Sequence, residues 1–266
     1  MASVDGMDLQ LTGKRAIILG GTKGIGRAAA EALAREGAIV TVAARHDVEP
    51  IAAEIAADTG GTVHGVVIDS RDDASVQAGV AAAVAAMGGV DILVNTAAAP
   101  WSAAKNTVAS QTGDDAMREE FEEKVLGYLR AARAVAPHLV AQGWGRIVNI
   151  SGLGARKSGS VAQTVRNISV AAITKNLADE LGPHGVNVTV VHPGLTRTAA
   201  VDALLQKRVD AGEPDAERTM AGNIIGRIVT PGELADVIVF LASPRSVAIT
   251  GGAVDAGGGT PGVVTY

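Results

Sequence analysis

The residues best suited to hold a charged ligand form a glycine-rich turn near the start of the chain. A short aliphatic run, Arg15–Leu19, precedes this turn, and an alanine-rich segment with helical spacing follows it. Glycines let the backbone turn sharply and approach a phosphate closely, and a helix N-terminus adds free N–H groups and a positive dipole end. Strand, turn and helix in this order predict a pyrophosphate site for a dinucleotide, and a tight turn that binds nothing is the alternative. The expected phosphate-binding residues are Gly20, Thr22, Lys23, Gly24, Ile25 and Gly26.

Charges at the end of the next expected strand, Ile39–Ala43, indicate which dinucleotide binds. An NAD site usually carries Asp or Glu here, to hold the ribose 2′-hydroxyl. This chain has Arg45 and His46 instead, and Lys23 lies within the glycine turn. Cations pair with a 2′-phosphate, so NADP(H) is favoured and NAD is the weaker candidate. Asp47 is a minor competitor, and the alternative for Arg45 and Lys23 is that both are solvated surface charges.

Strand-like and helix-like segments alternate along the chain and predict the fold. Apolar strands without alternation are buried on both faces, and strands that alternate with helices imply right-handed crossovers and a parallel sheet. We expect one Rossmann-type α/β domain over 1–266, a doubly wound parallel sheet flanked by helices. The other expected strands are Val63–Ile68, Asp91–Asn95, Arg146–Ile150 and Val186–His192, and the expected helices are Gly24–Glu36, Ala74–Met87, Asp115–Gln142 and Gln163–Gly182.

The later part of the chain contains one well-marked helix and one long excursion. Thr230, Pro231 and Glu233 have the spacing of an N-cap, a first helical proline and a capping box, and the helix they begin should run to about Leu241. Residues 198–226 are charged and less periodic. Such an excursion is usually a lid or a substrate loop, and a solvated pair of helices is the alternative.

Composition excludes several classes of protein. A net charge of −5 with dispersed basic residues gives no field that attracts nucleic acid. The chain has no cysteine, which excludes disulfides, thiolate zinc sites and a cysteine nucleophile. No secretory signal is visible, and the most apolar helical stretch, Gly79–Val90, is too short to cross a bilayer. We expect a cytoplasmic protein that acts on a small molecule, without a metal, a membrane or a nucleic acid.

Further motifs, together with the glycine turn, make the chain resemble the short-chain dehydrogenase/reductase family over nearly all of its length. The resemblance implies that Asp69, with Ser70, reads the adenine, that Asn95-Thr96-Ala97 follows the fourth strand of the sheet, and that a Pro-Gly loop holds the nicotinamide. It also implies a homodimer or homotetramer built on two long helices, here Asp115–Gln142 and Gln163–Gly182. The expected Pro-Gly loop residues are Pro193, Gly194, Thr196 and Thr198, and the C-terminal signatures are Gly226-Arg227-Ile228-Val229 and Thr250-Gly251-Gly252.

The catalytic centre departs from the family's pattern. The family uses Asn, Ser, Tyr and Lys, in which the Tyr protonates a carbonyl oxygen, the Lys lowers the pKa of that Tyr and holds the nicotinamide ribose, and the Asn anchors a water. Matching the helix by its end places Gln163 at the Tyr position and Asn167 at the Lys position. Lys124 falls at the Asn position, and the Ser falls at Ser151 or Gly152.

The missing phenol limits the chemistry. An amide such as that of Gln163 donates a hydrogen bond but delivers no proton near neutral pH, and a positioned acid is worth roughly 10²- to 10⁴-fold in rate. Lys and Asn look exchanged at 124 and 167. Lys124 with Tyr128 is a conceivable replacement acid, and a dimer interface is the alternative for that helix face. Arg166 either binds a carboxylate or enolate oxygen or forms a salt bridge.

Other candidates remain open at the level of the sequence. His192 either faces the cofactor or is structural. Pocket walls are expected from Trp101–Gly113 and Thr198–Gly226. We expect an NADP(H)-dependent oxidoreductase with an atypical active site. The alternatives are a non-redox isomerase, cyclase or dehydratase on the same scaffold, and a silent cofactor-binding protein.

Overall fold

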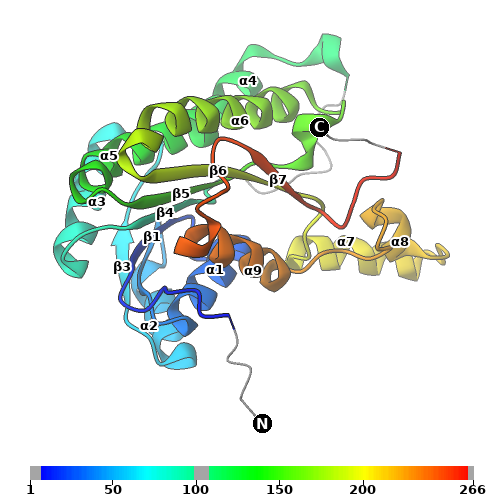
Figure 1. Ribbon diagram of the computed structural model, residues 1–266. Helices are drawn as coiled ribbons and strands as arrows, with labels where there is room; N and C mark the ends of the chain where they lie inside the picture. The colour runs from blue at the N-terminus through cyan, green and yellow to red at the C-terminus, as the bar shows by residue number, and fades with distance from the viewer. Residues whose placement is uncertain (1–6, 99–107, 263–266) are drawn as a thin grey trace.

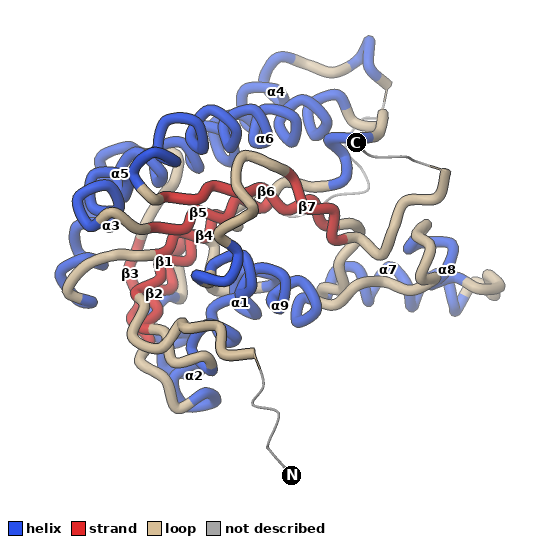
Figure 2. Tube along the Cα trace, in the orientation of Figure 1, coloured by secondary structure: helices blue, strands red, loops and turns tan. Residues whose placement is uncertain are grey.

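A seven-stranded parallel sheet forms the centre of the computed structural model, which describes residues 7–98 and 108–262 (Figures 1 and 2). The strand order is β3-β2-β1-β4-β5-β6-β7, and every neighbouring pair is parallel. This arrangement is the expected Rossmann-type sheet. The strands are β1 (Arg15–Leu19), β2 (Ile39–Ala44), β3 (Val63–Val67), β4 (Ile92–Asn95), β5 (Gly145–Ile150), β6 (Val186–Pro193) and β7 (Ala253–Ala256).

Helices cover both faces of the sheet. The layers on either side are seen edge-on in Figure 1. Alternate residues of β1 enter opposite cores, because successive side chains of a strand point to opposite faces. Ala16 and Ile18 belong to one core, whereas Ile17 and Leu19 belong to the other. One layer consists of α1 (Gly24–Arg35), α2 (Val48–Thr59) and α9 (Pro231–Ala242), and the other of α3 (Asp73–Met87), α5 (Gly127–Gln142) and α6 (Val161–Leu181).

The expected helix Asp115–Gln142 is interrupted, which corrects the sequence prediction. It consists of α4 (Asp114–Glu120), a π-helical segment η2 (Phe121–Leu126) and then α5. Such π segments often lie at functional sites. Gly127, at the start of α5, lies so close to the β3–α3 connection that a Cβ atom there would be 2.9 Å from the Cβ of Ser70. The shorter 3₁₀ segments are η1 (Ala109–Gln111), η3 (Leu153–Arg156), η4 (Gly182–His184) and η5 (Pro244–Ser246).

The excursion at 198–226 contains two helices, α7 (Ala199–Asp210) and α8 (Ala216–Ala221), which project from the sheet as a lobe. We call it the α7/α8 lobe. The next helix, α9, begins with the predicted capping box: the Thr230 hydroxyl accepts from the Glu233 N–H, and the Glu233 carboxylate accepts from the Thr230 N–H. This box fixes the point at which the chain returns from the lobe to the sheet.

The strand order reverses beside β1, since the chain moves from β1 outward to β2 and β3 and then crosses to β4. Ligands of such sheets bind outside the carboxyl ends of the strands, at this reversal. The glycine turn after β1 and the ends of β4, β5 and β6 all lie at that edge. Among the helices of the described residues, none is both long enough and apolar enough to cross a membrane.

Candidate active site

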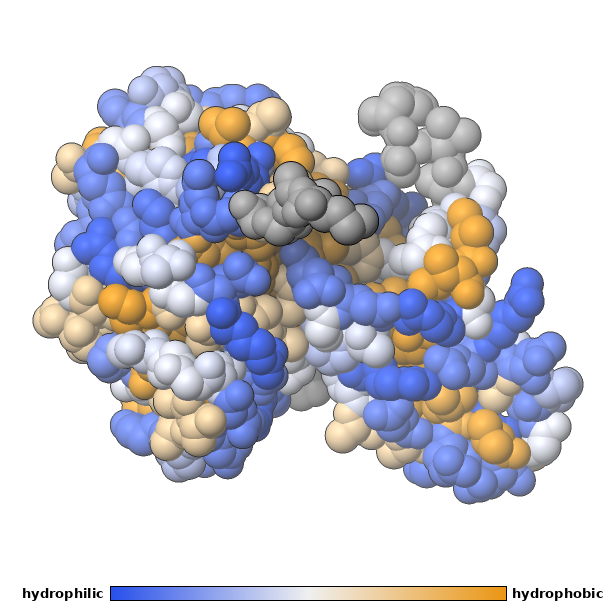
Figure 3. All heavy atoms as spheres, turned by 60° about the horizontal axis from the view of Figure 1, so that its bottom comes forward, coloured by the Kyte–Doolittle hydropathy of each residue, from blue (hydrophilic) through white to orange (hydrophobic). Residues whose placement is uncertain are grey.

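A cleft of about 1410 Å³ runs along the carboxyl ends of the strands. We call it the main cleft. Its lining comes from the glycine turn, the ends of β2, β4, β5 and β6, the start of α6 and the α7/α8 lobe. Figure 3 shows the surface hollowed between this lobe and the body of the molecule. Its volume exceeds the roughly 300–1,000 Å³ of ordinary small-molecule pockets.

The glycine turn is packed on one side and open on the other. Gly20 has φ +85°, and a Cβ atom there would lie 2.6 Å from the backbone nitrogen of Ala97. A Cβ atom on Gly26 would collide with the carbonyl oxygen of Gly20. At Gly24, by contrast, nothing lies within 4 Å of that position. The turn is therefore a cradle held against the sheet, with open space on the side where a ligand would lie.

The first helix presents an uncapped N-terminus to this cradle. Lys23 is the N-cap residue of α1, and its side chain accepts no hydrogen bond from the N–H groups of the first turn. No acidic residue lies in that turn either. Free N–H groups beside glycines and a cation are the donors that a pyrophosphate needs, so the residues present fit a dinucleotide.

Charged side chains gather at the β2 end of the main cleft. Arg45 and His46 line it, as expected for the residues that meet a 2′-phosphate. Sequence reasoning missed Glu123, which also lines it and lies 3.8 Å from Arg45 (Oε1 to Nη2) and 3.3 Å from Arg71 (Oε2 to Nη2). The carboxylate comes from the π-helical segment, so no spacing rule based on a regular helix predicts it.

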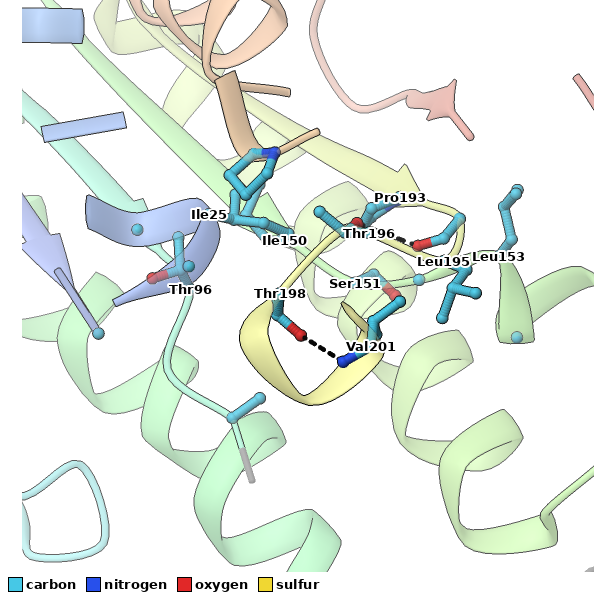
Figure 4. A pocket seen from close by; sticks show the side chains of 18 of the residues that line it. Ile25, Thr96, Ile150, Ser151, Leu153, Pro193, Leu195, Thr196, Thr198 and Val201 are labelled. Atoms are coloured by element: carbon cyan, nitrogen blue, oxygen red, sulfur yellow. Dashed lines mark hydrogen bonds between the residues drawn. The ribbon is translucent and has the colours of Figure 1, made fainter. Parts of the chain in front are cut away.

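The loop after β6 closes the other end of the main cleft. Pro193, Gly194, Thr196 and Thr198 line it, in agreement with the expected Pro-Gly loop. Figure 4 shows two hydrogen bonds that hold this loop. The Thr196 hydroxyl donates to the carbonyl of Gly194 at 3.2 Å, and the Thr198 hydroxyl accepts from the N–H of Val201 at 3.4 Å. The second bond caps α7, so the loop and the α7/α8 lobe are coupled.

Lys124 brings an amine to the floor of the main cleft. Its side chain leaves the π-helical segment, and the residue is only 4% exposed. The Nζ atom donates to the carbonyl oxygen of Ser151 at 2.7 Å and to Oδ1 of Asn167 at 3.2 Å. Burial and the charge of Arg166 hold the pKa of Lys124 well below its ordinary value, and the charge of Glu120 opposes them without cancelling them.

Arg166 and Glu120 form a buried ion pair next to Lys124. The guanidinium Nη1 contacts the Glu120 carboxylate, and the two residues are 8% and 3% exposed. Of the two roles considered for Arg166, the structure therefore shows the salt bridge. Its Nε atom is buried and has no hydrogen-bond partner in the described part of the chain.

Tyr128 is not a replacement acid. The residue is buried, its hydroxyl donates to the carbonyl oxygen of Ile150 at 3.1 Å, and it does not line the main cleft. Burial raises the pKa of its phenol, with a smaller contribution from the charge of Glu123. Tyr128 packs with Val125 and Val170 inside the molecule, so the suggested dimer contact is also wrong for this side chain.

The remaining expected catalytic residues line the main cleft, and their polar groups differ in how far they are already hydrogen-bonded. The Ser151 hydroxyl donates to the backbone oxygen of Asn167 at 2.9 Å. Gly152 lies against the same residue, since a Cβ atom there would be 3.1 Å from Asn167 Nδ2. Gln163 lines the main cleft, and its amide makes no hydrogen bond to any described residue. An incoming oxygen can therefore accept from Gln163.

Three sequence candidates support the main cleft from outside its lining. Asp69 accepts a hydrogen bond from the N–H of Arg71 at 3.0 Å. Because Asp69 does not line the main cleft, its expected contact with adenine stays a prediction. Asn95 is fully buried and donates to Asn149 at 2.9 Å. His192 is buried on β6, and burial lowers its pKa more than the charge of Asp255 raises it. Trp101 lies outside the described residues.

Three apolar side chains line the substrate end; Val201 belongs to the expected wall Thr198–Gly226, whereas Leu153 and Leu195 were not expected. Leu153 follows β5, Leu195 follows β6, and Val201 lies on α7 (Figure 4). The rule that ligands meet the carboxyl ends of strands would have pointed to Leu153 and Leu195. Over residues 7–98 and 108–262, no three His, Asp or Glu side chains gather where they could hold a metal ion.

Comparison with known proteins identifies the family. Residues 20–260 match the family model described as Enoyl-(Acyl carrier protein) reductase. The chain is 36% identical over 250 residues to the short-chain reductase protein NovJ of Streptomyces niveus, across 92% of this chain and 93% of that protein. It is 32% identical over 257 residues to 7alpha-hydroxysteroid dehydrogenase of Clostridium sardiniense, across 94% of each.

A solved structure extends this similarity to the fold. L-sorbose reductase from Gluconobacter frateurii, complexed with NADPH and L-sorbose, superimposes with a TM-score of 0.87 at 28% identity, covering 97% of this chain and 100% of that one. The family model and the relatives match nearly the whole chain, and the strand order agrees with the fold expected from the sequence motifs. The chain therefore belongs to the short-chain dehydrogenase/reductase family of oxidoreductases.

Proposed function

We propose that the chain is an NADP(H)-dependent oxidoreductase in which Gln163 and Asn167 stand where the family has its Tyr and Lys. The observation that carries this proposal is the open glycine cradle at the uncapped start of α1, continuous with the main cleft in which Lys124 and Gln163 lie. The glycine turn, Arg45 and the Pro-Gly loop line the main cleft as a cofactor site would need, whereas the position expected to move a proton carries an amide.

Cations at the β2 end support NADP(H) over NAD. Arg45 is half exposed, and the Lys23 ammonium makes no hydrogen bond or ion pair with a described residue. A 2′-phosphate placed between them would pair with both, and Arg45 would then exchange its 3.8 Å contact with Glu123 for a stronger one. When bound, NADPH supplies the hydride. The similar L-sorbose reductase was solved with NADPH, which also favours this choice.

The site lacks a proton donor at position 163, and this lack limits the substrates that it can reduce. Gln163 donates a hydrogen bond to a substrate oxygen and cannot give up the proton. We therefore expect substrates that need little acid assistance, namely activated carbonyls, imines and conjugated alkenes. Their bodies should be apolar where they meet Leu153, Leu195 and Val201.

Stopped-flow absorbance of NADPH against a panel of these three compound classes tests the proposal. We expect oxidation of the cofactor by at least one class, and a slower or absent reaction with simple unactivated ketones. Saturable NADPH binding without oxidation by any compound would contradict hydride transfer. A product of unchanged redox state, formed without NADPH consumption, would instead indicate an isomerase, cyclase or dehydratase.

Assembly and location belong to the same proposal. Leu126 and Ile168 are exposed apolar residues on the π-helical segment and α6, at 37% and 49%. We propose that these helices pair in a homodimer or homotetramer, as the family resemblance implies, and light scattering after size-exclusion chromatography measures the assembly. A monomer at micromolar concentration would contradict it. The cytoplasmic location and the absence of nucleic-acid and membrane partners stay predictions.

A further inference from the structure

We propose that Lys124 is a nucleophile that captures aldehydes and ketones entering the main cleft as imines. The inference starts from the hydrogen bonds of its Nζ atom. Those bonds end on two acceptors, the carbonyl oxygen of Ser151 and Oδ1 of Asn167. A neutral amine has two N–H groups, so both are satisfied here and the lone pair is left over. An ammonium group would have a third N–H with no acceptor among the described residues.

The neighbouring ion pair removes the counter-ion that an ammonium group would need. Glu120 is the carboxylate whose charge favours the protonated form of Lys124, and Arg166 already binds it. Arg166 also places a positive charge beside Lys124. Desolvation next to another cation is one of the ways in which proteins make a lysine amine nucleophilic at neutral pH.

The other titratable groups around Lys124 either favour its neutral amine form or have little effect on its protonation. Arg166 on α6 and His192 on β6 lie close enough to Lys124 for their charges to interact with it. Burial keeps His192 in its neutral form at neutral pH, because its pKa is lowered. Tyr128 on α5 is held by Ile150 and stays protonated, because its pKa is raised. Lys124 is thus a buried amine that borders a cleft large enough for a carbonyl compound.

The chemistry balances without an oxidant or reductant. The lone pair of Nζ attacks the carbonyl carbon, and a C–N bond forms as the carbon–oxygen π bond breaks. The two hydrogens of the amine then leave with that oxygen as water, and a C=N bond remains. The Gln163 amide can donate to the oxygen during attack, and attack of water on the imine regenerates both partners. The substrate class is an aldehyde or ketone with an apolar body, which suits Leu153 and Leu195.

Reductive trapping tests the inference without NADPH. The purified full-length chain is mixed with hexanal or benzaldehyde and sodium cyanoborohydride at pH 7, and the modified lysines are mapped by peptide mass spectrometry. We expect Lys124 to be alkylated at least about tenfold faster than exposed lysines, since each unit by which its pKa is lowered gives about tenfold more neutral amine. Lys124→Met should lose this fast phase, whereas Lys207→Met, the same change at an exposed lysine of α7, should keep it.

The outcomes separate this inference from the proposed function. Fast alkylation of Lys124 in a chain that does not bind NADPH would support the imine and contradict the oxidoreductase. NADPH oxidation with Lys124 modified no faster than exposed lysines would overturn the imine and leave the oxidoreductase standing. Because the wild-type peptide map gives both rates, the conclusion holds even if Lys124→Met does not fold.

Discussion

The side chains of Lys124 and Asn167 are joined by a hydrogen bond of 3.2 Å between Nζ and Oδ1, although they lie 43 positions apart in the chain. The family resemblance predicts that these two residue types have exchanged places in this chain. The contact shows that the two side chains meet in the folded chain: the amine of Lys124, on the π-helical segment, reaches Asn167, the residue at the expected lysine position.

The triple variant Lys124→Asn, Gln163→Tyr, Asn167→Lys should recover acid-assisted reduction. It supplies a phenol at 163 and an ammonium group four residues later on α6, which is the arrangement the family resemblance implies. A positioned acid contributes roughly 10²- to 10⁴-fold, so NADPH oxidation by an unactivated ketone should rise by about 10²-fold or more. The single variant Gln163→Tyr is the matched control and should gain less. Equal rates for wild type and triple variant would show that the missing phenol does not limit the reaction.

Arg166→Met should protonate Lys124. Removing the guanidinium takes away a positive charge beside Lys124 and one ion-pair partner of Glu120, and both changes raise the pKa of Lys124. The rate of reductive trapping at Lys124 at pH 7 should then fall about tenfold for each unit by which its pKa rises. The rate should recover at higher pH.

Arg166→Lys is the control for that variant, because it keeps a cation beside Glu120. We expect its trapping profile to stay closer to wild type than that of Arg166→Met. A pH profile of Lys124 alkylation that is identical in all three proteins would contradict the role given to the ion pair.

Arg45→Ala should weaken the binding of NADPH and leave the binding of NADH unchanged. A charge-assisted hydrogen bond is worth roughly 1.5–3 kcal/mol, which corresponds to a loss of about 10- to 100-fold in affinity for the 2′-phosphate form. Calorimetric titration of both cofactors measures the ratio. Arg35→Ala, an exposed arginine at the end of α1 outside the main cleft, should leave it unchanged. An equal loss of affinity for both cofactors would mean that Arg45 does not contact the 2′-phosphate.

Gly26→Ala should abolish cofactor binding. The added methyl group would collide with the carbonyl oxygen of Gly20 and the hydroxyl of Thr96, so the cradle must open or the helix must shift. Gly182→Ala is matched to it, because nothing lies within 4 Å of the new methyl group and its φ is −55°. We expect saturable NADPH binding in the second variant only. Undiminished binding by Gly26→Ala would contradict the close packing of the turn.

The strands were the part of the fold that sequence patterns predicted best. Continuous apolar residues mark a strand buried on both faces, and β1 has the expected bounds, Arg15–Leu19. β7 was missed because Ala253–Ala256 is short and contains Asp255, and it is a strand through its pairing with β6. α2, Val48–Thr59, was missed as well, since it has no side-chain cap and carries Pro50 in its first turn.

The candidate site could be predicted as far as regular spacing holds. The glycine turn, Arg45 and the Pro-Gly loop line the main cleft because each directly follows a strand. Lys124 and Tyr128 were assigned to one helix face by the rule for residues four apart, which assumes a regular α-helix. A π-helical segment ends between them, so Lys124 borders the cleft while Tyr128 points into the core. The same segment hides Glu123 from sequence reasoning.

Asp91→Asn should destabilise the folded chain, because Asp91 links the residues just before β4 to the start of β1. Asp91 accepts Arg15 Nε at 2.7 Å and the Arg15 N–H at 2.9 Å, which ties β4 to β1. Loss of the charged partner should cost about 1–3 kcal/mol of unfolding free energy. Burial raises the pKa of Asp91, but the hydrogen bonds from Arg15 outweigh it, and the pKa is lowered overall. The folded-state contribution is therefore complete above the ordinary pKa of 3.8 and is lost as the pH falls through the lowered value.

Urea unfolding of wild type and Asp91→Asn between neutral pH and pH 3 measures both effects. The gap in unfolding free energy between the two proteins should be constant near neutral pH and should close only at the acidic end. A gap that stays constant to pH 3 or widens there would contradict the lowered pKa.

Calorimetric titration of the wild-type chain with NADPH and with NADH tests whether the glycine turn and the two nearby cations bind a phosphorylated dinucleotide. The open cradle at the start of α1 and the cations Lys23 and Arg45 predict saturable binding of both, tighter for NADPH. A stronger response to NADH would contradict the role of the two cations. The absence of saturable binding for either cofactor would contradict the dinucleotide site itself.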